Sequence, residues 1–141
     1  MLTLEERVIK LISLSEQGNF LEALQAFYAE DAVMQENNEP PSIGLANILE
    51  HERKVMAVLK QIHVNRADSF LVDGNRAAIN WIYEYTDQRG RRHRLNELAY
   101  QQWRHGKIVC ERFYYDPEQM RIEITAEGHP FRPIDTATIV A

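Results

Sequence analysis

FYAEDAVMQENNEPPSIG, from Phe27 to Gly44, has the pattern of a helix end, one short strand and a polar turn that leads into another helix. The run "DAVMQE" favours a strand, and the turn residues Asn, Pro and Ser follow it directly. Glu36 therefore stands at the end of a short strand between two helices. An acidic side chain at that place is the first candidate for a chemical role.

Apolar residues recur at helical spacing on both sides of this segment. The first helix begins near Leu4, where Thr3 and Glu6 have the spacing of a capping box, and it ends at "QGN". The second helix is "FLEALQAFYA". A third helix is expected from about Leu45 to Lys60.

From Ile62 onward the hydrophobic period changes to two, which is typical of strands. Four strands are expected near 62–73, 76–87, 91–103 and 107–115, separated by turns that contain "DGN", "QRG" and "RHG". This order predicts an α+β fold in which three N-terminal helices cover one face of a curved antiparallel sheet. We expect one domain over 1–141, with a core of about 4–120 and a C-terminal tail of 121–141.

Composition and charge exclude several classes of protein. The 141 residues carry a net charge of −5, which argues against a nucleic-acid partner. No apolar run approaches the roughly 18 residues that a membrane-spanning helix needs. The single cysteine, Cys110, excludes an internal disulfide, and the N-terminus lacks the pattern of a secretory signal. A cytoplasmic location without a membrane partner is expected.

Two of the turns predict the register of the sheet. "QRG" and "RHG" each suit a three-residue hairpin loop that ends in a left-handed glycine. The first loop pairs Trp81 with Glu97. The second pairs Trp103 with Lys107 and Glu97 with Phe113. Odd-numbered residues then face the concave side under the helices, and the predicted wall of the pocket is Trp81, Tyr83, Ala99, Gln101, Trp103, Phe113 and Tyr115.

Two carboxylates, Glu97 and Glu111, lie on this inner face among aromatic rings. Burial of charge is costly unless the group is paired, is protonated or has a task, and crowding raises at least one pKa. That change is what a general acid near neutral pH requires. The alternative is a structural role, with Gln101, Tyr83 or an arginine as the partner, and both interpretations stay open.

The histidines offer no metal motif such as His-Glu-x-x-His, so no metal site is predicted. His63, at the start of the strand after the third helix, is a further acid/base candidate, as is His93. A surface or hydrogen-bonded role is the alternative for each. No phosphate-cradling glycine loop or serine nucleophile motif is present, and no cofactor is expected.

The chain resembles the nuclear-transport-factor-two-like superfamily, and within it the SnoaL-like group related to polyketide cyclases. The resemblance covers about Leu4 to Met120 and is carried by "NFLEALQAFYAEDAVMQ" and "WRHGKIVCERFYYDP". It implies a cystatin-like α+β roll in which a cone-shaped, curved antiparallel sheet wraps around the three N-terminal helices, with a pocket inside the cone and dimerisation through the sheet. For this chain the outer residues Ile82, Leu98, Tyr100, Cys110 and Tyr114 would form the dimer patch.

The ketosteroid isomerase branch is similar around "YAEDAVMQE", and Glu36 falls where that branch keeps its carboxylate base. The positions of the branch's two oxyanion donors fall near Ile12 and Ala99, neither of which can donate, so steroid isomerisation is disfavoured. Three functions stay open: an enzyme that uses Glu36, Glu97, Glu111 and His63 on an apolar cyclic or polyketide-like ligand, a non-catalytic binding module, and a dimerisation domain.

Overall fold

The computed structural model of the chain describes residues 1–124. Residues 125–141 of the predicted tail lie outside the described residues. Helices α1 (Leu4–Glu16) and α2 (Phe20–Phe27) come first, and α3 (Leu45–Val58) follows the strands β1 (Tyr28–Glu36) and β2 (Ser42–Ile43). Strands β3 (Leu59–Asp73), β4 (Arg76–Asp87), β5 (Arg92–Arg104) and β6 (Lys107–Tyr114) complete the sheet, and the short 3-10 helix η1 (Pro117–Met120) follows.

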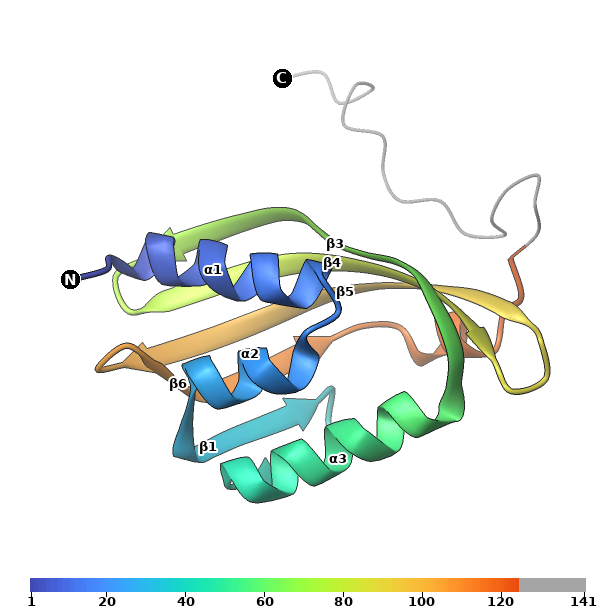
Figure 1. The fold of residues 1–141 in the computed structure, drawn as a ribbon, viewed down its shortest axis with the longest axis horizontal. Helices are drawn as coiled ribbons and strands as arrows, with labels where there is room; N and C mark the ends of the chain where they lie inside the picture. The colour runs from blue at the N-terminus through green and yellow to red at the C-terminus, as the bar shows by residue number, and fades with distance from the viewer. Residues whose placement is uncertain (125–141) are drawn as a thin grey trace, which may run out of the picture.

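The predicted α+β fold is confirmed. The described strands form one curved, unclosed sheet in the order β2-β1-β6-β5-β4-β3, and Figure 1 shows the three helices on one side of it. The sheet is mostly antiparallel, but β1 pairs with β6 in parallel. This pairing places the end of β1 beside the end of β6, with Glu36 opposite Phe113. The segment from Phe27 to Gly44 therefore contributes to the sheet as well as to the helical layer.

The ends of the helices follow local sequence. Thr3 Oγ1 accepts a hydrogen bond from the Glu6 amide, and the Glu6 carboxylate accepts one from the Thr3 amide, each at 3.1 Å, which confirms the capping box. Helix α3 ends two residues earlier than expected and continues directly into β3 at Leu59. No helix of the described part of the chain is long and apolar enough to cross a membrane.

The predicted register is right for one hairpin and wrong for the next. Trp81 pairs with Glu97 across β4 and β5, as expected. Trp103, however, pairs with Ile108 instead of Lys107, and Phe113 pairs with Ala99 instead of Glu97. The reason is a two-residue turn in which both central residues, His105 (φ 51°) and Gly106 (φ 76°), are left-handed.

A bulge in β6 compensates for this shorter turn. The register shifts between the pairs Gln102–Cys110 and Trp103–Ile108, which leaves Val109 as the extra residue. Ile108 therefore replaces Val109 as a buried core residue. Beyond the bulge, Glu111 again faces the interior, so the odd-numbered assignment holds at that end of the strand.

The core lies between the helices and the concave face of the sheet. It joins apolar residues of α1, α2, β1 and α3 to those of β4, β5 and β6. On the convex face, Leu98, Tyr100 and Tyr114 are exposed by 43%, 40% and 44%, and Cys110 is also exposed. Ile82 differs from the expected patch because it is only 3% exposed.

Candidate functional site

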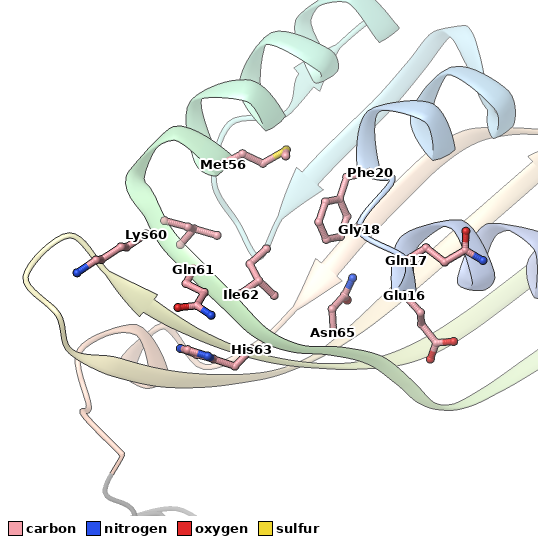
Figure 2. A pocket seen from close by; sticks show the side chains of 11 residues that line it. Glu16, Gln17, Gly18, Phe20, Met56, Lys60, Gln61, Ile62, His63 and Asn65 are labelled. Carbon is pink, nitrogen blue, oxygen red and sulfur yellow. The ribbon is translucent and has the colours of Figure 1, made fainter.

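Two hollows lie inside and beside the cone. The inner cavity, of about 80 Å³, has walls from α1, α2, α3 and the sheet, and its polar lining includes Tyr28, Glu52, Tyr83, Gln101 and Glu111. The outer cleft, of about 450 Å³, lies between the turn after α1, the end of α3 and the start of β3. Both are lined by Phe20, which Figure 2 shows at the start of α2, facing the cleft. The two hollows are therefore adjacent compartments.

Glu111 is held in place at the inner cavity by a chain of hydrogen bonds. Its carboxylate accepts from the Tyr28 hydroxyl and from Gln101 Nε2, the latter at 2.6 Å. Gln101 Oε1 in turn accepts from Trp103 Nε1 at 3.0 Å. Burial raises the pKa of Glu111 to about 7, although the bonds from Tyr28 and Gln101 act in the opposite direction.

Glu97 has the opposite surroundings. It is 7% exposed, its carboxylate forms no hydrogen bond among residues 1–124, and its two oxygen atoms are not fully enclosed. It lies opposite Trp81, which lines the inner cavity. Burial is the largest cause that raises the pKa of Glu97, to about 8, and repulsion from Glu36, Glu111 and Glu52 adds to it. Glu97 is therefore an acid that is largely protonated at neutral pH.

A third polar group stands where β1 ends. Glu36 accepts a hydrogen bond from the Tyr115 hydroxyl at 3.3 Å and lies 3.3 Å from Nε2 of His51 on α3. The side chain of Glu36 is 39% exposed. Burial raises the pKa of Tyr115, and the negative charge of Glu36 raises it further. Of the three predicted carboxylates, Glu36 is thus the one most exposed to solvent.

The predicted wall residues divide into two sets. Trp81, Tyr83, Gln101 and Phe113 line the inner cavity. Ala99 and Trp103 are buried in the core, and Tyr115 bonds to Glu36 instead of lining the cavity. The rings of Trp81 and Tyr83 stack at 6.0 Å.

The two histidine candidates lie apart from the glutamates. His63 is exposed, lines the outer cleft, and has its Nε2 atom 2.6 Å from Thr86 Oγ1. His93 is 1% exposed and lies between two acceptors: Nε2 is 2.8 Å from the Asp87 carboxylate, and Nδ1 is 2.9 Å from the Ile122 carbonyl. Within residues 1–124, no group of three or more His, Cys, Asp or Glu side chains is arranged to hold a metal ion.

Sequence reasoning missed Glu52 and Tyr28 as site residues. Glu52 lies on the inner stripe of α3 and lines the inner cavity, where burial raises its pKa, His51 lowers it and Glu36 raises it. The signal was a single acidic residue at an apolar position of the helical stripe. Tyr28 is buried at the junction of α2 and β1, and its partner Glu111 is 83 residues away in sequence.

Residues 2–115 match the family of the SnoaL-like domain, so the chain belongs to that family. No protein among the curated ones matches it. Among solved structures, the chain is similar to a candidate SnoaL-like polyketide cyclase from Mesorhizobium loti, with 24% identity, a TM-score of 0.74, and coverage of 81% of this chain and 100% of that one.

Two further structures have the same fold. A candidate polyketide cyclase from Streptomyces antibioticus has 19% identity and a TM-score of 0.67, with 83% of this chain and 94% of that chain covered. A protein of ketosteroid-isomerase-like fold from Catenulispora acidiphila, solved in complex with trimethylamine, has 17% identity and a TM-score of 0.69, with 83% and 90% covered. At these identities the similarity establishes the fold.

Proposed function

We propose that the protein is a small-molecule enzyme in which Glu97 moves a proton to or from a ligand held in the cone. The observation that carries this proposal is that Glu97 is buried and lacks a hydrogen-bond partner within residues 1–124. A buried carboxylate without a partner is destabilising, and such groups are retained where a ligand completes them. A carboxyl group with a pKa of about 8 exchanges protons near neutral pH, as acid/base catalysis requires.

Two tyrosines are placed to support such a step. Burial is the first cause that raises the pKa of Tyr28 and of Tyr83, and neighbouring glutamates raise it further. Both hydroxyls therefore stay protonated and can donate to oxygen that gains negative charge. Ile12 and Ala99, at the donor positions of the ketosteroid isomerase branch, are buried and apolar, so the site of this chain uses other donors than that branch.

The volumes of the two compartments limit the size of the substrate that each can hold. The inner cavity of about 80 Å³ is smaller than the roughly 150 Å³ cavity that holds benzene in an engineered protein core. A cyclic apolar ligand would therefore place one end in the inner cavity and its body in the outer cleft of about 450 Å³. The cyclase-like neighbours are compatible with a ligand of that kind.

The ring opening of 5-nitrobenzisoxazole tests the proposal, because it requires only a base in an apolar site. The base removes the hydrogen on C3, the N–O bond breaks, and a coloured cyanophenolate forms. We expect a rate that rises with pH to a plateau above about pH 8, since Glu97 must lose its proton to act. Glu97→Gln is expected to lower the protein-dependent rate by about 100-fold or more.

Glu22→Gln on the exposed side of α2 is the matched control and should leave the rate unchanged. An unchanged rate in Glu97→Gln would overturn the assignment of Glu97. Bound ligand without turnover in the wild-type protein would instead identify a non-catalytic binding module, which the complete pairing of Glu111 favours as the second candidate.

We also propose that the convex face forms a homodimer. Leu98, Tyr100 and Tyr114 are large apolar or aromatic side chains that lie exposed on adjacent strands, and such patches favour a protein partner. Sedimentation at increasing concentration tests this, and a monomer at every concentration would remove the proposal.

A further inference from the structure

Several side-chain acceptors in and beside the two hollows have no hydrogen-bond partner within residues 1–124. Within residues 1–124, Oδ1 of Asn65 is the one fully buried side-chain nitrogen or oxygen without a hydrogen bond. Asn65 lines the outer cleft, and its own Nδ2 atom donates to the Ser15 carbonyl. The carboxylates of Glu97 and of Glu52, which lines the inner cavity, also have no hydrogen-bond partner within the described residues. These groups accept hydrogen bonds, so a ligand group that satisfies them is a donor.

The charges around the interior have one sign. No lysine or arginine is among the described residues that line the inner cavity. Lys60 lines the outer cleft, together with Glu16, so their charges offset each other there. The titratable groups around Glu97 and the cavity come from four elements and from the segment after β6, and they are Tyr28 and Glu36 of β1, His51 and Glu52 of α3, Tyr83 of β4, Glu111 of β6, and Tyr115 just after β6.

Aromatic faces accompany these acids. Trp81 and Tyr83 are stacked with an interplanar angle of 21°, and Phe20, Tyr28 and Phe113 complete the aromatic lining of the inner cavity. The negative face of an aromatic ring attracts a cation, and the attraction is strongest where water is excluded. Acidic side chains and aromatic rings that line one small cavity therefore favour the same kind of ligand.

We infer that the inner cavity binds the protonated amine head group of a hydrophobic ligand whose body lies in the outer cleft. This inference rests on the proposed function and names its substrate class. The size of the inner cavity suits a head group of a few heavy atoms, and Phe20, which borders both hollows, lies where head and body would meet. The N–H groups can donate to Glu52, an acceptor without a hydrogen bond within residues 1–124 that lines this cavity.

Matched amines and alcohols test the inference, because each pair differs mainly in charge. We would measure binding of benzylamine against benzyl alcohol, and of 2-naphthylmethylamine against 2-naphthalenemethanol, by NMR titration of the full chain at pH 8. Each amine is expected to bind about tenfold or more tightly than its alcohol, since opposite charges a few ångströms apart attract strongly in a partly buried site. Benzoate, an anion of similar size, should not bind.

Proton release gives a second readout. An amine cation near Glu97 favours the carboxylate over the acid, so binding should release protons and strengthen from pH 6 to pH 8. Glu97→Gln should remove most of the amine preference and leave alcohol binding unchanged, while Glu22→Gln should change neither. An alcohol that binds as tightly as its amine in both pairs, or no binding by either at millimolar concentration, would overturn the inference.

These outcomes separate the inference from the proposed function. An amine preference that depends on Glu97, without turnover of 5-nitrobenzisoxazole, supports an amine-binding module and contradicts the enzyme. Turnover that depends on Glu97, without an amine preference, supports the enzyme and contradicts the amine as its substrate class.

Discussion

Asp87 and Glu97 lie ten residues apart along one β-hairpin and have opposite surroundings. The Asp87 carboxylate accepts hydrogen bonds from the backbone amides of Arg89 and Arg91, from Arg91 Nε at 3.0 Å and from His93 Nε2 at 2.8 Å. Glu97 accepts none within the described residues. The two carboxylates share a sheet, but they differ in their hydrogen-bond partners and in burial, since the side chain of Asp87 is 20% exposed and Glu97 is 7% exposed.

The pKa values of the two carboxyl groups move in opposite directions, because hydrogen bonds act on Asp87 and burial acts on Glu97. The hydrogen bond from His93 is the largest cause that holds the pKa of Asp87 well below its usual range, and the bonds from Arg91 and Arg89 add to it. Burial without a donor raises the pKa of Glu97. We therefore interpret Asp87 as a group that stabilises the folded state and Glu97 as a group that destabilises it. This contrast favours Glu97 as the functional residue.

The largest expected effect comes from removing the Glu97 charge. The pKa of Glu97 in the folded state, about 8, lies above its ordinary value, so the folded protein keeps a proton that the unfolded chain loses between about pH 4.5 and pH 8. Stability should therefore fall as the pH rises through this window. Glu97→Gln should be more stable than wild type at pH 9 by on the order of 3 kcal/mol and equally stable at pH 4.

Urea unfolding between pH 4 and pH 9 measures this difference, with Glu22→Gln as the control for loss of one negative charge. Parallel pH profiles for wild type and Glu97→Gln would show that Glu97 is not a destabilising group, and the contrast with Asp87 would then disappear.

A smaller effect is expected from His93→Leu, which removes a partner of Asp87. This substitution should lower the stability of the protein, whereas Glu97→Gln should raise it. The substitution leaves the Ile122 carbonyl without its donor and removes one of the four hydrogen bonds to Asp87. We expect a loss of about 1–3 kcal/mol of unfolding free energy at pH 7. The stability that Asp87 contributes is present above its usual pKa and is lost as the pH falls, so the difference from wild type should shrink in acid.

Thermal melts at pH 7 and pH 3 measure this loss. His63→Leu is the matched control because His63 is an exposed histidine with one side-chain contact, to Thr86, and its substitution should cost less. Equal losses for the two histidine variants would contradict the structural role given to the Asp87–His93 pair.

Much of the fold could be predicted from local sequence, and much of the site could not. The stretch "QRG" predicted the register of the first hairpin correctly, because a type I turn followed by a glycine has one common hairpin geometry. "RHG" is compatible with two turns, and His105 takes the left-handed conformation that a sequence pattern does not reveal. The inner face was still predicted because the bulge at Val109 restored the alternation.

The partners of the carboxylates depend on contacts between distant segments. Glu97 and Glu111 were expected on the inner face from alternation alone. That Glu111 is paired and Glu97 is not depends on Tyr28, which joins β6 through the parallel strand β1. The Asp87–His93 pair depends in turn on Ile122, beyond the last strand. Periodicity shows which way a side chain points, and only the tertiary structure shows what it meets.

Tyr28→Phe has the smallest expected effect and sharpens the comparison within the cavity. Removing the hydroxyl leaves Glu111 with Gln101 as its donor and makes it more similar to Glu97. Because the bond from Tyr28 lowers the pKa of Glu111, its loss should raise that pKa above about 7. The cost in stability should be about 1 kcal/mol and should grow as the pH rises and Glu111 ionises. Carbon NMR titration of the glutamate carboxyl groups measures the shift, and an unchanged Glu111 titration would mean that burial alone sets its pKa.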